Sequence, residues 1–139
     1  MILPEYIKIG YKKYKVRNLD KNVGDLCQAF GATSHNESLI FSDDTRDERE
    51  NLNTLVHEVL HGVCFVFSLG KSKEEEEQIV NLLANGLVGV LIDNPELLEY
   101  INSSVEEINE KEKRRKKTSR RKSSGRGRRN PKKQGKAKR

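Results

Sequence analysis

The first part of the chain alternates apolar and polar residues. The alternation runs from Tyr6 to Val16 on both sides of Gly10, which is the period expected of two half-buried strands joined in a hairpin. A short apolar run over residues 38–42 indicates a further strand, because turn-forming residues follow it. The pattern therefore predicts a small β-sheet near the N-terminus.

Between these strands the spacing of apolar residues becomes helical. Asn22 is placed to cap a short helix, and Gly31 is placed to end it. The apolar residues at helical spacing are Val23, Leu26, Cys27 and Phe30. We therefore predict one short helix between the hairpin and the strand at residues 38–42.

Two long helices are predicted in the middle of the chain. Over residues 46–67 the apolar positions follow the i, i+3, i+4, i+7 pattern of an amphipathic helix. Over residues 74–92 apolar residues occur on nearly every side, so this second helix is expected to be the more buried of the two. Asn94 ends it, because a residue that precedes a proline is pushed out of helical geometry.

A last helix is predicted over residues 96–110. It is expected to pack through its apolar residues, which are Leu97, Leu98, Ile101 and Val105. Together these elements predict an α+β fold in which short N-terminal strands pack on a helical core.

Charge divides the chain into two parts. Residues 1–110 hold 10 Lys and Arg against 20 Asp and Glu, a net charge of −10, and residues 111–139 hold 17 against 1, a net charge of +16. The basic segment has no apolar residue except Ala137, so we predict a disordered tail at 111–139 after a domain at 1–110. Non-specific, salt-sensitive binding of nucleic acid is one expectation for this tail. A solubilising tail that folds over the acidic body is the other.

No secretion signal or membrane span is predicted. The N-terminus lacks a basic stretch followed by a long apolar core. The longest apolar run, residues 82–92, is interrupted by Asn85 and is shorter than the roughly 20 residues that a membrane helix needs. Cys27 and Cys64 lie in apolar helical patterns without metal-binding spacing, so reduced, buried thiols are predicted. We expect a cytoplasmic protein that does not enter membranes.

Residues 57–61, His-Glu-Val-Leu-His, form an HExxH motif within the first long helix. Residues four apart lie on the same face of an α-helix, so the imidazoles of His57 and His61 can reach one metal ion. Glu58 projects about 100° away from His57 and is placed to accept a proton from water without being a ligand. The spacing therefore favours a zinc site with an adjacent general base.

Two histidines alone hold zinc poorly, so a third ligand from another element is required. Glu77 is our candidate, because it forms one stripe of the second long helix with Asn81, Ala84 and Val88. Ala84 is small enough to let the two helices approach closely. The neighbouring glutamates at residues 74–76 suit the positive end of the helix dipole, and a helix-starting charge is the alternative role for Glu77.

These two helices resemble the ImmA/IrrE-type metallopeptidase family. The family pattern is HExxH followed on the next helix by E-x-x-A-N-x-F-A, and this chain has the first motif at residues 57–61 and E-Q-I-V-N-L-L-A over residues 77–84. Val80 stands where the pattern has Ala, and Leu83 where it has Phe. The resemblance covers about residues 1–100 and looks like the short standalone versions found in phages and mobile elements.

The motif and this resemblance imply a zincin-like fold and a zinc peptidase. By resemblance, His57, His61 and Glu77 would bind Zn²⁺, Glu58 would be the general base, and a repressor-type regulatory protein would be the substrate. We therefore predict a zinc endopeptidase of narrow specificity. The alternative is a catalytically silent metal-binding module that binds a protein partner or nucleic acid through its basic tail. A purely structural helical protein is a third interpretation.

Two further features bear on the substrate. A peptide is expected to add as a strand along residues 39–41 if that strand forms an exposed edge. His35 lies in the polar segment 33–36, where a solvated loop residue is the simpler interpretation and an auxiliary electrophile is the other.

Overall fold

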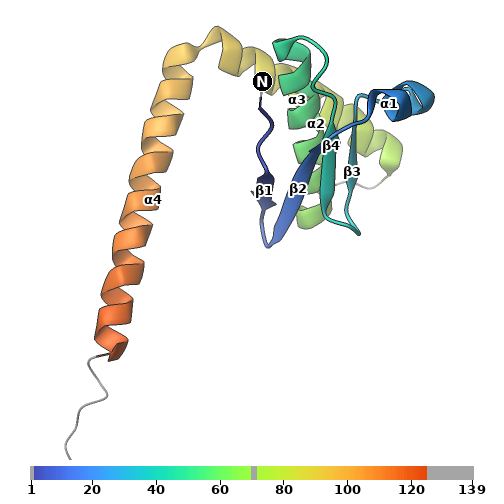
Figure 1. The fold of residues 1–139 in the computed structure, drawn as a ribbon. Helices are drawn as coiled ribbons and strands as arrows, with labels where there is room; N and C mark the ends of the chain where they lie inside the picture. The colour runs from blue at the N-terminus through green and yellow to red at the C-terminus, as the bar shows by residue number, and fades with distance from the viewer. Residues whose placement is uncertain (1, 70–71, 125–139) are drawn as a thin grey trace, which may run out of the picture. The chain divides into compact units, whose positions relative to one another are not determined.

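The computed structural model describes residues 2–69 and 72–124 of the chain. Its contacts divide the chain into two units, Met1–Asn94 and Pro95–Arg139 (Figure 1). The first unit is an α+β domain that contains all the strands and three helices, and the second contains one long helix. The predicted α+β fold class is therefore confirmed, and the zincin-like fold stays a prediction.

Four strands form one sheet. They are β1 (Tyr6–Ile9), β2 (Lys12–Asn18), β3 (Gly31–Ser34) and β4 (Leu39–Ser42). The order across the sheet is β1-β2-β4-β3, in which β2 and β4 are parallel and the two outer pairs are antiparallel. Gly10 in the β1–β2 turn has a φ angle of 55°, in the left-handed region that glycine enters most easily.

The predicted hairpin and the predicted strand at residues 38–42 are confirmed. Strand β3 has no counterpart in the prediction, because its four residues form a strand only through their pairing with β4. Strand β4 lies between β2 and β3, so residues 39–41 do not form the exposed edge on which peptide addition along them depended. The edge on that side of the sheet is β3.

Three helices complete the first unit, α1 (Lys21–Cys27), α2 (Glu48–Phe67) and α3 (Lys73–Asp93). Asp20, rather than Asn22 as predicted, caps α1, because its carboxylate accepts the backbone N–H of Asn22 at 2.9 Å. In the same way Asp47 accepts the N–H of Glu50 at the start of α2, and Ser72 accepts that of Glu75 at the start of α3.

The core lies between the sheet and α2, which packs along one face of the sheet (Figure 1). Its buried residues from the sheet are Ile9, Tyr14, Val16 and Ile40, and Leu55, Val59, Val63 and Val66 of α2 pack against them. Gly62 lets α2 approach closely, since a Cβ there would lie 2.5 Å from Ile9 Cδ1. The free thiol of Cys64 is buried, as predicted.

Helix α3 packs on α2, and the prediction that it is the more buried of the two is wrong. One stripe is buried, at Val80, Ala84 and Val88. The large apolar residues on its other sides are exposed: Ile79, Leu82, Leu83, Leu87, Val90 and Ile92. The reason is that α2 occupies the face of the sheet, so α3 has one neighbouring helix to cover it within this unit.

The second unit contains one long helix. Helix α4 (Pro95–Ser124) continues past residue 110, so the predicted disorder is wrong for residues 111–124, and residues 125–139 lie outside the described residues. Lys and Arg are good helix formers, and ion pairs one turn apart, such as Lys113 with Glu110 at 2.8 Å, support the helix. The predicted packing of residues 97–105 on the other helices stays a prediction.

None of the described helices combines the length and apolar character that crossing a bilayer requires.

Candidate metal centre

The imidazoles of His57 and His61 lie on the same side of α2, one turn apart. Their Nε2 atoms are 3.0 Å apart, and each side chain is 18% exposed. Both residues belong to α2, and the apolar residues on the other face of this helix pack against the core of the sheet. The HExxH spacing has therefore placed two nitrogen donors next to each other at the surface of a rigid helix.

Glu77 reaches the same point from α3. Its Oε1 lies 3.5 Å from His57 Nε2, and its Oε2 lies 3.2 Å from His61 Nε2. Asn81, one turn further along α3, donates its Nδ2–H to Glu77 Oε1 at 2.9 Å. The structure thus brings together the three residues predicted as metal ligands, with their donor atoms all within 4.8 Å of one another.

The approach of α3 to α2 depends on the stripe that includes Glu77. Ala84 and Val88 on this stripe and Val80 beside it are each at most 2% exposed, so small and β-branched side chains fill the space between the helices. A polar contact adds to this packing, since Asn53 of α2 donates to Asn85 of α3 at 2.7 Å. Valine at position 80 is accommodated in this packing.

Glu76 contacts the other nitrogen of His61. Its Oε1 lies 2.7 Å from His61 Nδ1. A carboxylate on the far nitrogen of a histidine fixes the ring orientation and leaves the lone pair of Nε2 for a metal. The sequence pattern assigned Glu76 to helix-starting charge, and no spacing rule could reveal this contact, since the two residues lie on different helices.

The donor set fits a divalent metal ion. Zinc binds imidazole nitrogen at about 2.0–2.1 Å, so two nitrogens on one ion lie within about 4.2 Å of each other, and the His57 and His61 Nε2 atoms meet that condition at 3.0 Å. Burial, followed by the charge of His61, lowers the pKa of His57, which favours the neutral ring that has a free lone pair. The group could therefore hold a metal ion through two imidazoles and a carboxylate.

Glu58 is buried beside this group and is held by strand β3. Its side chain is 5% exposed, and the Thr33 hydroxyl lies 2.7 Å from its Oε2 and 2.9 Å from its backbone oxygen. Burial raises the pKa of Glu58, and the hydrogen bond from Thr33 acts in the opposite direction. The carboxyl group is thus a fixed, poorly solvated acid next to the metal-ligand cluster.

Gly31 makes room for Glu58. A Cβ at Gly31 would lie 2.6 Å from Glu58 Oε1 and 2.7 Å from its Cγ, which is closer than atoms in contact can approach. The sequence pattern suggested a helix end for Gly31, whereas its lack of a side chain lets Glu58 lie against β3. Gly31 and Thr33 therefore belong to the candidate site, and sequence patterns did not indicate them.

These groups line one cavity of about 700 Å³. Its wall combines β3 and the segment before it with α2 and α3, and includes His57, Glu58, His61 and Glu77. Such a volume is within the range of about 300–1,000 Å³ in which proteins hold ligands. The cavity therefore has room for a ligand beside the group that could hold a metal ion.

His35 also lines this cavity, in the turn between β3 and β4. Its ring stacks on Phe65 with centroids 4.1 Å apart and planes at 8°, and its Nδ1 lies 3.3 Å from the Tyr14 hydroxyl. His35 is therefore a half-buried residue of this turn that packs against α2 and the sheet.

Neither a family model nor a curated protein nor a solved structure matches this chain. The resemblance to the ImmA/IrrE-type family stays a prediction based on the two motifs.

Proposed function

We propose that the chain is a zinc-dependent endopeptidase. The observation that carries this proposal is the convergence of His57, His61 and Glu77 beside a buried Glu58 in one cavity. The resemblance at residues 57–61 and 77–84 supports a repressor-type regulatory protein as the substrate.

His57, His61 and Glu77 would hold the ion. Bound there, zinc would supply Lewis acidity, which polarises a peptide carbonyl and lowers the pKa of a water molecule to about 7. Two neutral imidazoles and one carboxylate leave such a site with a net charge of about +1, which suits the negative charge that develops on the carbonyl oxygen.

Glu58 would act as general base and then as general acid. Its carboxylate accepts a proton from the attacking water and returns it to the leaving amide nitrogen. Its raised pKa supports this role, because a proton carrier works best when its pKa is near the working pH. The contacts of Glu58 with Thr33 and Gly31 hold the carboxyl group in place for both transfers.

Strand β3 would position the substrate. It forms the sheet edge on the cavity side, and Gly31, Ala32 and Thr33 line the cavity. A peptide that pairs with β3 as an added strand would run along the wall that also carries Glu58. The substrate strand assigned to residues 39–41 by the sequence pattern is thus reassigned to β3.

Metal content tests the ligand set. The wild-type protein is expected to bind one zinc ion per chain, and Glu77→Ala is expected to lose it, because two histidines alone hold zinc weakly. Elemental analysis after dialysis measures both. Glu75→Ala is the matched control, since Glu75 is an exposed glutamate two residues before Glu77 on the same helix and its loss should leave the zinc content unchanged. Wild-type protein without stoichiometric metal would overturn the proposal.

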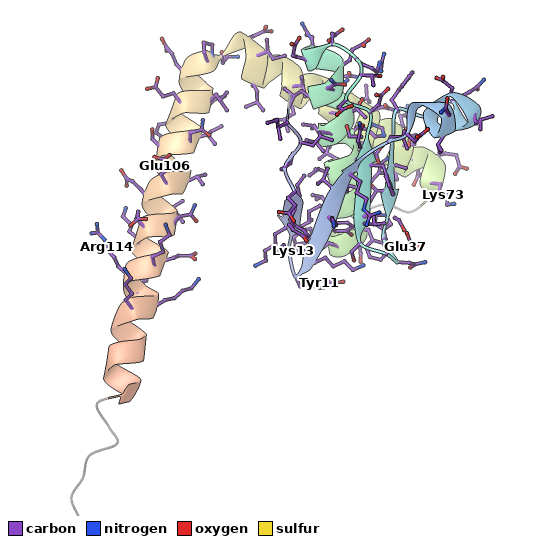
Figure 2. All side chains as sticks on the ribbon, in the orientation of Figure 1. Tyr11, Lys13, Glu37, Lys73, Glu106 and Arg114 are labelled. Carbon is purple, nitrogen blue, oxygen red and sulfur yellow. The ribbon has the colours of Figure 1, made fainter. Side chains whose placement is uncertain are left out.

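A second candidate function is a catalytically silent metal-binding module that binds a partner or nucleic acid. The observation that favours it is the basic part of α4, in which residues 111–124 hold nine Lys and Arg against one Glu. Figure 2 shows side chains such as Glu106 and Arg114 projecting from this helix. Such a segment suits the phosphate backbone of nucleic acid.

Removal of the basic segment tests this second candidate. Deletion of residues 111–139 is expected to abolish retention of the protein on DNA, because phosphate contacts by Lys and Arg supply non-specific affinity. Elution from immobilised duplex DNA over a salt gradient measures it. Unchanged retention of the truncated protein would assign the binding to the first unit or to the remainder of α4.

A further inference from the structure

His35 is a titratable side chain in the cavity that neither the ligand set nor the general base uses. It directly follows strand β3, and its turn lies at the same end of the sheet as the β1–β2 turn, as Glu37 and Tyr11 show in Figure 2. A substrate paired with β3 would therefore run towards the His35 ring. The inference below rests on the proposed function and assigns His35 a part in the same reaction.

The ring of His35 is held on several sides. Phe65 of α2 stacks on it at 4.1 Å, and Tyr14 of β2 contacts its Nδ1 at 3.3 Å. The Lys12 ammonium donates to the backbone oxygen of His35 at 2.6 Å and lies 4.8 Å from the centre of the Phe65 ring. A loop side chain held in this way is preorganised, which a group that acts on a transition state requires.

The contact with Tyr14 determines which ring nitrogen carries the proton. Tyr14 is fully buried, and burial raises the pKa of its hydroxyl, so the group keeps its proton. If the buried Tyr14 hydroxyl only accepted a hydrogen bond, its own hydrogen would be left without a partner. Among the described residues, His35 Nδ1 is placed to accept that hydrogen. Tyr14 therefore donates to Nδ1.

With Nδ1 as acceptor, the hydrogen of the neutral ring is on Nε2. Burial lowers the pKa of His35, which favours the neutral form. Since the Tyr14 hydroxyl contacts Nδ1 and His35 lines the cavity, the Nε2–H is the donor that this ring can offer to a group in the cavity.

We propose that His35 is a further catalytic residue, whose Nε2–H donates a hydrogen bond to the carbonyl oxygen of the peptide bond that is cleaved. Negative charge develops on this oxygen when water adds to the carbonyl carbon, and a fixed N–H donor stabilises that charge. His35 keeps its proton throughout, since the proton of the water goes to Glu58. Tyr14 is a positioning residue, which acts through the tautomer of His35.

The first test is the tautomer, measured by ¹⁵N NMR on metal-free protein labelled at its histidines. We expect a protonated Nε2 and an unprotonated Nδ1 for His35 in the wild type, and a shift towards protonated Nδ1 in Tyr14→Phe. A wild-type ring with its proton on Nδ1 would overturn the inference, whatever the activity of the protein.

The second test is kinetic and uses His35→Phe, which keeps an aromatic ring to stack on Phe65. We expect kcat for a cleaved peptide to fall about 10²–10³-fold, the usual cost of removing one such donor, with KM and zinc content unchanged. His35→Gln, which retains an N–H donor, should recover part of the loss. Asn36→Ala, in the same turn and exposed, is the matched control.

The outcomes separate this inference from the proposed function. A wild-type protein that binds zinc and cleaves peptides, together with a His35→Phe variant of equal kcat, would overturn the role of His35 alone. A loss confined to KM would also overturn it. A wild-type protein without zinc would overturn the proposed function, while the tautomer measurement would still report on the Tyr14–His35 contact.

Discussion

Replacement of Glu58 by glutamine is expected to reduce peptide cleavage by about 10²–10⁴-fold and to leave zinc binding intact. Glutamine has nearly the shape of glutamate and its amide oxygen can still accept from Thr33, but it cannot take a proton from water. The proposed ligands lie on His57, His61 and Glu77, so the metal site does not depend on the Glu58 carboxylate.

Turnover of a peptide library, measured beside zinc content, checks this expectation. Glu48→Gln is a suitable control, because Glu48 is an exposed glutamate in the first turn of the same helix. Equal turnover by Glu58→Gln and wild type would remove Glu58 from the chemistry. Zinc-loaded wild-type protein that cleaves nothing would favour the silent binding module instead.

The Glu58→Gln variant is also expected to fold well. Burial raises the Glu58 pKa above its unfolded value, so in the metal-free protein the ionised carboxylate opposes folding at neutral pH, and stability rises as the pH falls through the folded pKa. A neutral amide removes that cost. Metal-free Glu58→Gln should therefore unfold at the same temperature as metal-free wild type or higher at pH 7, which calorimetry measures.

Substitution of Gly31 by alanine is expected to reduce cleavage by about 10²-fold or more while zinc content stays near one per chain, because the general base is displaced and the ligands are not. The added Cβ would meet Oε1, Cγ and Cδ of Glu58, all within 2.9 Å. Movement of one terminal atom does not relieve three such contacts, so either the Glu58 side chain or strand β3 must shift. Overpacking of this kind costs about 1–3 kcal/mol of stability.

Gly86→Ala is the matched control for the Gly31 substitution. Gly86 lies within α3, and a Cβ there meets nothing within 4 Å. Alanine is better than glycine in a helix by about 1 kcal/mol, so this variant should keep full activity and gain stability. Full activity of Gly31→Ala would contradict the view that β3 fixes the position of Glu58.

Local periodicity explains what could be predicted. The hairpin, β4, α2 and α3 follow from the spacing of apolar residues within each segment, and the His57–His61 pair follows from one helical turn. Glu77 could be predicted only from the periodicity of the next helix, on which it lies in one stripe with Ala84. Ala84 and Val88 of that stripe are buried, and the more exposed Glu77 extends its carboxylate from the same stripe towards the histidines.

Contacts between distant segments explain what could not be predicted. Strand β3 exists through pairing with β4, and the order of strands decides that β3 rather than β4 is the edge. The contacts of Glu58 with Thr33 and of His61 with Glu76 join different elements and leave no periodic signal. For this reason the candidate ligands and Glu58 could be predicted from the sequence. The residues that orient them, Glu76, Thr33 and Gly31, could not.

The errors about burial and disorder have a common origin. An apolar composition on nearly every side of α3 suggested a buried helix, but composition does not provide neighbours to cover it. A segment without apolar residues suggested disorder at residues 111–124, but a helix can form from good helix formers with ion pairs such as Lys111 with Glu107 at 3.1 Å. In both cases the composition of a segment was known, but the residues that contact the segment in the folded chain were not.

The helical form of residues 111–124 sets a linear charge density. A helix rises about 1.5 Å per residue, so these 14 positions span about 21 Å, with a net charge of +8 from nine cations and one glutamate. The same residues in an extended chain would spread that charge over about twice the length. Mutual repulsion of the cations therefore opposes the helix at low ionic strength, and added salt or a polyanion of similar charge spacing, such as duplex DNA with one charge per about 1.7 Å, should increase its helical content.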